Sequence, residues 1–92
     1  MQPATVQIGD FQLTFAEIKA WDLIQARREV RDGNGNVDDF EFGLALAWRS
    51  AVAGGFNRGF KDFGEMITAQ QLDNVLEVAK PFFAKAQAAR PG

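Results

Sequence analysis

The side chains best suited to bind an ion in this sequence lie between Asp32 and Asn36. Asp32, Asn34 and Asn36 match the first, third and fifth positions of an EF-hand calcium loop, where oxygen atoms coordinate the ion. The sixth position requires glycine and is Val37 here, and the twelfth requires a bidentate glutamate and is Gly43. Because the turn residue and the principal ligand are both missing, calcium binding is the weaker interpretation. We expect a loop between two helices.

The glycine-rich segment 54–59 (GGFNRG) has the outline of a phosphate-binding loop. In that motif a lysine follows the last glycine directly, and a strand precedes the loop. Here Phe60 follows Gly59, and the residues before the segment have the apolar spacing of a helix. We therefore interpret the segment as the end of a helix followed by a linker.

Catalytic side chains are scarce. The sequence contains no His and no Cys, so the common pairs of nucleophile and base cannot be built. The usual ligand sets for zinc, haem and iron–sulfur clusters are missing for the same reason. Ser50 is the only serine and has no base nearby in the sequence. Carboxylates recur at helical spacing in Asp62 with Glu65 and in Asp73 with Glu77, which is more typical of a solvated helix face. We predict that the protein is not an enzyme and uses no cofactor or metal.

Composition and charge limit the remaining classes. A chain of 92 residues with a hydrophobic fraction of 47% fits one globular domain, residues 1–92. The net charge is −2 and is mixed along the chain, which argues against nucleic acid as the main partner. No apolar run approaches the roughly 18 residues that cross a membrane, and the N-terminus lacks the features of a signal peptide. We expect a cytoplasmic protein.

The phenylalanines are the most unusual feature. The sequence has nine Phe and two Trp but no Tyr, which is a large apolar content for a thin core. Phe56, Phe60 and Phe63 have helical spacing, for which core packing is the ordinary explanation. Phe82 and Phe83 are consecutive, about 100° apart on a helix, so we expect at least one to face a partner or a second copy. All five are predicted protein-binding residues.

The elements that position these residues can be read from spacing and capping signals. Apolar and polar residues alternate around Gly9, which predicts a hairpin that packs on helices or pairs with another chain. Capping boxes at Thr14, Asp38 and Thr68 predict three helix starts, and Pro81 should kink or end the last helix. We expect a mainly α fold with an N-terminal β-hairpin (α+β), a small bundle of three to four helices. The predicted elements are a β-hairpin over residues 5–14, helices over 15–31, 38–53 and 69–80, a short helix over 60–66 and a helical tail over 82–89.

Four segments together resemble a known family. They are residues 13–18 (LTFAEI), 44–51 (LALAWRSA), 67–72 (ITAQQL) and 78–83 (VAKPFF). In this order, after a short hairpin, they resemble the small tail assembly chaperones of long-tailed bacteriophages and gene transfer agents. The resemblance covers roughly residues 5–83 and consists of apolar positions, without an invariant chemical motif. The 32–36 loop and the glycine- and phenylalanine-rich linker do not match that family.

The resemblance implies a role in virion assembly. Chaperones of this family bind the long helical tape measure protein in the host bacterial cytoplasm, keep it soluble and self-associate along it. Tail tube subunits then displace them, and translational frameshifting often produces short and extended forms, of which this chain would be the short one. The residues themselves leave an alternative open. A small phage or bacterial inhibitor or adaptor would occlude one partner surface and bind one-to-one as a monomer.

Overall fold

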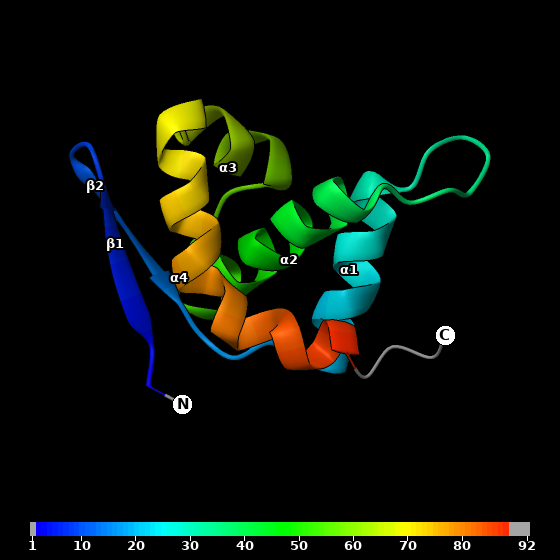
Figure 1. Ribbon diagram of the computed structural model, residues 1–92, viewed down its shortest axis with the longest axis horizontal. Coiled ribbons are helices and arrows are strands. Elements are labelled where there is room, and N and C mark those ends of the chain that lie inside the picture. The colour runs from blue at the N-terminus through cyan, green and yellow to red at the C-terminus, as the bar shows by residue number, and fades with distance from the viewer. Residues whose placement is uncertain (1, 89–92) are drawn as a thin grey trace.

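The computed structural model describes the backbone of residues 2–88 and the side chains of residues 2–84. Over this range the chain forms an N-terminal hairpin followed by four helices (Figure 1). This arrangement confirms the predicted fold class, mainly α with an N-terminal β-hairpin. The elements are β1 (Ala4–Ile8), β2 (Phe11–Phe15), α1 (Ala20–Val30), α2 (Asp39–Ala53), α3 (Phe60–Met66) and α4 (Ala69–Ala88).

The hairpin follows from the alternation of side chains around a glycine turn. The two strands are antiparallel, with Val6 opposite Leu13. Gly9 has a φ of 57°, and no residue other than glycine has a positive φ in the described part of the chain. A type II′ turn requires a positive φ only at its first central residue, so this pattern fits type II′ and excludes type I′. The hairpin pairs within the chain, which answers the question that the sequence left open for β1 and β2.

One face of the hairpin is apolar and buried, and the other is polar. Directly opposite residues of an antiparallel pair lie on the same face. The buried face carries Val6, Ile8, Leu13 and Phe15. On the outer face the hydroxyls of the opposite threonines lie 3.2 Å apart. Because a lone hairpin is marginal in water, its stability depends on the packing of this apolar face against α2 and α4.

The end of β2 is fastened to the last turns of α2. The Ser50 hydroxyl donates to the carbonyl oxygen of Ala16 at 2.6 Å, and the Ala16 amide donates to the Ser50 carbonyl oxygen at 3.1 Å. Gly54, the residue after α2, lies directly against the backbone carbonyl of Thr14, where a Cβ atom would overlap with it. Only glycine permits this approach of the two backbones.

These contacts explain why the predicted helix over residues 15–31 is wrong at its start. Thr14 and Phe15 belong to β2, where Phe15 pairs with Ala4 and is fully buried. The helix α1 begins only at Ala20, so the capping box proposed at Thr14 does not form. Its role is taken by Asp22, whose carboxylate accepts a hydrogen bond of 2.8 Å from the backbone amide of Lys19. Strand pairing and burial outweigh the local capping signal here.

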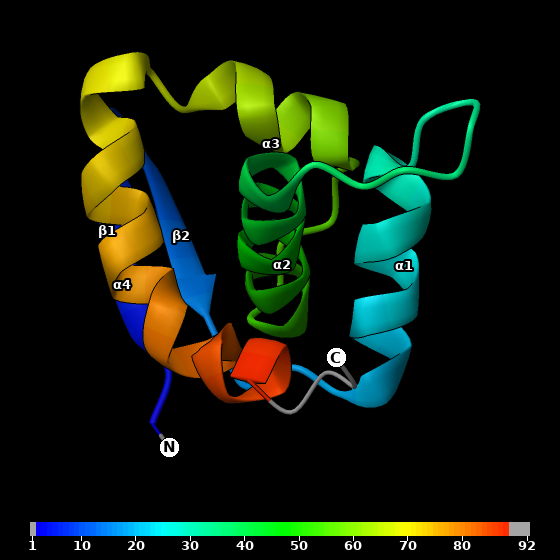
Figure 2. The same ribbon diagram turned by 45° about the vertical axis from the view of Figure 1, so that its right-hand side comes forward.

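The helix α2 lies at the centre of the fold, between α1 and α4 (Figure 2). Beyond its exposed first turn, its buried residues between Phe42 and Ala51 face in all directions around the helix axis, as expected for a helix that is largely covered. Three alanines, Ala45, Ala47 and Ala51, are fully buried, and such small side chains let neighbouring elements approach closely. Asp38 caps its N-terminus through a hydrogen bond of 3.3 Å from the Phe40 amide. The helix therefore begins one residue later than the predicted range of 38–53.

The last helix, α4, combines two elements that were predicted separately. Thr68 and Gln71 form the predicted capping box, with reciprocal hydrogen bonds of 3.1 and 3.2 Å. The helix then continues to Ala88 with Pro81 inside it, and it changes direction in its orange part (Figures 1 and 2). The predicted bend is present, but the predicted tail over 82–89 is not a separate helix. Residue 89 lies outside the described residues.

Candidate protein-binding surface

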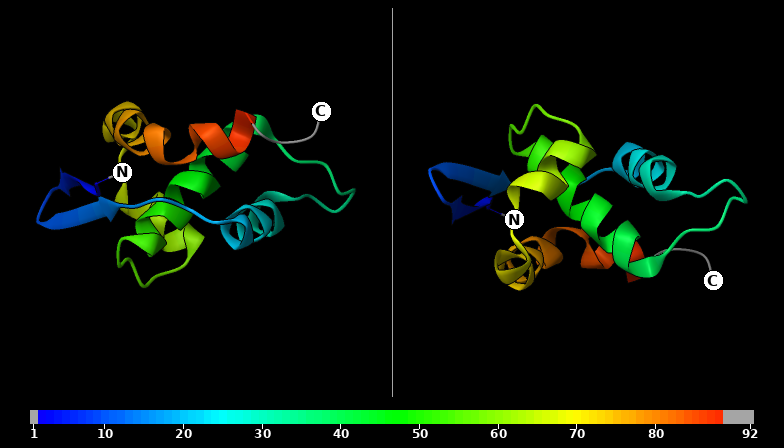
Figure 3. Two further views of the ribbon diagram at one scale, coloured as in Figure 1. Left: turned by 90° about the horizontal axis from the view of Figure 1, so that it is seen from below. Right: turned by 90° about the horizontal axis from the view of Figure 1, so that it is seen from above.

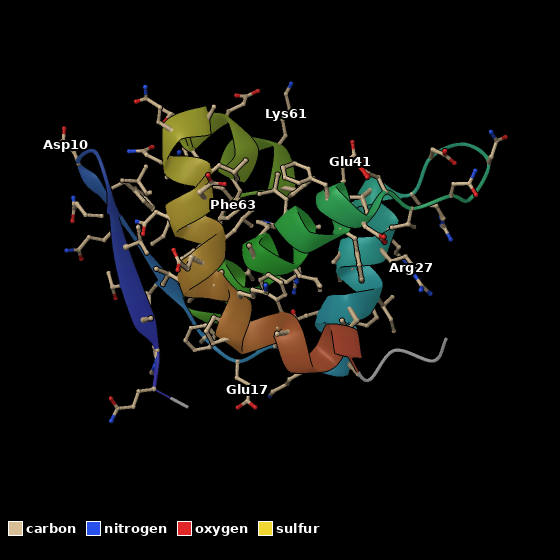
Figure 4. All side chains as sticks on the ribbon, viewed as in Figure 1. Asp10, Glu17, Arg27, Glu41, Lys61 and Phe63 are labelled. Atoms are coloured by element: carbon tan, nitrogen blue, oxygen red, sulfur yellow. The ribbon has the colours of Figure 1, made fainter. Side chains whose placement is uncertain are left out.

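The five phenylalanines predicted to bind a partner lie in or against the core. Phe56, Phe63, Phe82 and Phe83 are buried, and Phe60 is partly buried against the same cluster. Figure 4 shows Phe63 pointing into the interior between α3 and α4. Core packing, the ordinary explanation for the stripe, is what the structure shows, and neither Phe82 nor Phe83 is exposed as was expected for at least one of them.

The burial of both Phe82 and Phe83 has a structural cause. Past its bend, α4 runs below α2 (Figures 1 and 2). Consecutive residues about 100° apart can then both face the core. Phe82 is 6% exposed and Phe83 is 4% exposed. The expectation that at least one of the two is exposed holds for a helical segment with a single covered side.

The stripe of Phe56, Phe60 and Phe63 holds α3 against α2. The Phe56 and Phe63 rings meet edge to face with centroids 5.7 Å apart, and Phe60 lies 5.8 Å from the ring of Trp48. The Trp48 indole N–H donates to the Arg58 carbonyl oxygen at 3.0 Å. This aromatic cluster fixes the glycine-rich segment as a structured linker, in agreement with the expected helix end and linker.

The large apolar side chains that do reach the surface are different ones. Trp21 is 56% exposed, Ile24 is 45% exposed and Phe40 is 56% exposed, whereas Phe11 on β2 is 38% exposed and meets the Phe56 ring edge to face. On α1 the positions 21, 24 and 28 fall within an arc of about 60°, opposite the buried Ala26. We call Trp21, Ile24 and Arg28 the α1 outer face. The Arg28 guanidinium lies 5.9 Å from the centre of the Trp21 ring, so a cation partly covers an aromatic side chain that is otherwise open.

A partly buried ion pair fixes the helix that carries this face. The Asp22 Oδ1 atom accepts from Arg49 Nε at 2.8 Å and lies 2.8 Å from a terminal guanidinium nitrogen of the same side chain. The Arg49 guanidinium also lies 4.9 Å from the centre of the Trp48 ring. Because Asp22 follows Trp21 directly, the exposed indole is attached to a constrained first turn of α1. Such rigidity lowers the entropy that a binding partner would have to remove.

Charged side chains surround the exposed apolar residues. Near the C-terminus of α1 they are basic, and at the N-terminus of α2 they are acidic (Figure 4 labels Arg27 and Glu41). Among the described residues the ion pairs are Asp22 with Arg49 and Lys61 with Glu65, and neither includes a charge of these two groups. The basic side chains are Arg27, Arg28 and Arg31, and the acidic ones are Asp38, Asp39 and Glu41.

Comparisons with known proteins identify no relative. No model of a protein family, no curated protein and no solved structure matches the chain.

The candidate sites for ions and catalysis have structural explanations in the described residues. One carboxylate oxygen of Asp32 accepts from the amides of Asn34 and Asn36 at 2.8 and 2.9 Å, which orders the loop. Over residues 2–84, no group of three or more acidic side chains lies close enough to hold a metal ion. The Ser50 hydroxyl is buried and donates to the backbone. The helices of the same range include none that is both long and apolar enough to span a lipid bilayer.

The sequence contained a signal for the α1 outer face that the predicted helix start concealed. With Phe15 and Ile18 included in the helix, the apolar residues form one broad stripe that runs from Ile24 round to Ala26. Without them, Trp21 and Ile24 stand apart from the core positions. A helix with two separate apolar sides is typical of one that packs on its own fold and also binds a partner.

Proposed function

We propose that this protein is a non-enzymatic protein-binding module, and that it acts as a tail assembly chaperone which coats a helical tape measure protein and self-associates during tail assembly in the cytoplasm of a bacterial host. The observation that carries the protein-binding part is the exposure of Trp21, Ile24 and Phe40 on a rigid pair of helices. Tryptophan and arginine are the residues that most often dominate binding energy in protein interfaces. An exposed indole with a stacked arginine fits that composition.

The assembly-chaperone part is supported by the order of sequence segments, which resembles this family. It is also supported by the division of the large apolar side chains between the core and the surface. Most of the phenylalanines stabilise a small fold, while a few separate anchors remain outside. Several weak contacts of this kind give avidity along a repetitive helical partner while each contact stays releasable. A chaperone that tube subunits displace needs that combination.

Sedimentation velocity tests the proposal. The chain is measured over a range of concentrations, alone and with an amphipathic helical segment of a candidate tape measure protein. We expect several copies of the chain to bind one segment, and we expect self-association to increase with concentration. A strict monomer that ignores the segment contradicts the proposal and favours the one-to-one inhibitor or adaptor instead.

A further inference from the structure

The exposed apolar anchors lie at opposite ends of the α1 and α2 pair. Asp22 at the start of α1 contacts Arg49 near the end of α2, and Arg31 forms an antiparallel bridge with Val37 across the loop. The two helices are therefore antiparallel. Trp21 lies near the end of the pair that joins the hairpin, and Phe40 lies near the loop end. Figure 3 shows the hairpin and this loop at opposite ends of the molecule.

The two anchors have rims of opposite charge. Arg28 stacks on Trp21 in the α1 outer face, and Arg27 lies beside it on the same helix. Around Phe40, Asp39 and Glu41 are exposed in the first turn of α2. We call Phe40, Asp39 and Glu41 the acidic end of α2. Each surface is an aromatic side chain bordered by charges, and their charges are complementary.

These charges do not satisfy one another within the chain. The loop brings the end of α1 next to the start of α2, yet the described residues form no ion pair between the arginines and the carboxylates of these two surfaces. Both sets therefore remain available to a neighbouring molecule. Complementary charge at the rim of an apolar contact fixes its register and excludes other partners more than it raises affinity.

We propose that the α1 outer face of one copy binds the acidic end of α2 of a second copy of this chain. In this contact Phe40 packs against Trp21 and Ile24, while Asp39 and Glu41 approach Arg27 and Arg28. The two surfaces are different, and every copy carries one of each. Each copy can therefore contact two neighbours, one through each surface. The inference assigns a surface to the self-association step of the proposed function and rests on that step.

Mixing two variants tests the pairing of these surfaces. Trp21→Ala removes the anchor of one surface and Phe40→Ala that of the other. Each variant alone should self-associate about thirtyfold more weakly than the original chain, as expected for an interface hot spot. An equimolar mixture should recover a complex of one copy of each, since one intact contact remains between them. Both side chains are exposed, so thermal melts should show folded variants, and Gln70→Ala is the control at an exposed site on α4.

Charge reversal provides a second test that does not alter the apolar anchors. One double variant carries Arg27→Glu and Arg28→Glu, and the other carries Asp39→Arg and Glu41→Arg. Neither double variant should self-associate alone, and mixing the two should restore association. Lys61→Glu with Lys80→Glu changes the net charge by the same amount as the first pair and should leave self-association unchanged. Unchanged association of either reversed pair, or no recovery on mixing, overturns the proposal. So does an original chain that is monomeric into the millimolar range.

Tape measure binding is measured separately on the same variants. The surface variants can weaken self-association while the original chain binds no tape measure segment. That result contradicts the proposed function and leaves this inference intact. Binding of several copies to one segment, with self-association that none of the four surface variants weakens, contradicts the inference and leaves the proposed function intact.

Discussion

Asp22 and Arg49 join the first turn of α1 to the last turns of α2 across 27 positions of sequence. The same Asp22 side chain accepts from Arg49 through one oxygen and from the Lys19 amide through the other. A single carboxylate therefore both caps α1 and fixes its angle to the central helix. The exposed Trp21 directly precedes this residue in the first turn of α1.

Removing one partner of this pair should destabilise the fold strongly. Asp22→Ala should lower the free energy of unfolding by about 3 kcal/mol, because it leaves a partly buried guanidinium without its partner. Arg49→Met keeps the aliphatic cover of Trp48, and the double variant should lose less than the sum of the two single changes. Urea denaturation measures all three. Lys61→Met, in an ion pair whose side chains are largely exposed, should change stability little. Additive losses would show that the two residues act independently.

Two glycine substitutions should have opposite effects on stability. Gly54→Ala places a Cβ into the backbone carbonyl of Thr14, so β2 and α2 must separate, at a cost of about 3 kcal/mol. Gly64→Ala lies inside α3 with open space around it and should gain about 0.5 to 1 kcal/mol from helix propensity. Thermal and urea denaturation compare the two variants. A neutral Gly54→Ala would mean that the end of the hairpin is not held against α2.

The phenylalanine pair at the bend of α4 should behave as core. Phe82→Ala and Phe83→Ala should each cost about 3 to 5 kcal/mol of stability, which is much of the total for a domain of this size. This replaces the expectation, based on sequence, that the pair mainly serves association. Phe82→Leu keeps most of the apolar volume and should remain folded, so its self-association can be measured. Weakened association of a stable Phe82→Leu chain would return Phe82 to the binding surface.

Local sequence patterns predicted the helices and strands better than they predicted which side chains are buried. The hairpin, the starts of α2 and α4 and the short α3 follow from signals within a few residues, such as the Thr68 and Gln71 capping box. The failures depend on contacts between distant segments. Thr14 satisfies a capping pattern but lies in a strand held by Ser50 and Gly54. The exposure of Trp21 likewise became readable only with the true start of α1, which strand pairing by Phe15 determines.

The loop between α1 and α2 should be insensitive to calcium. Asp32 accepts two backbone amide hydrogen bonds within the loop, so its carboxylate has a structural role without an ion. Asp32→Asn keeps an acceptor oxygen and should melt near the original temperature. Asp32→Ala loses both hydrogen bonds and should melt about 4 to 8 °C lower, the shift expected for a loss of about 1 kcal/mol in a domain of this size. Thermal melts in millimolar calcium and in chelator should coincide for all three chains. Stabilisation by calcium that disappears in Asp32→Ala would establish an ion site despite Val37 and Gly43, because a ligand that binds only the folded state raises its stability.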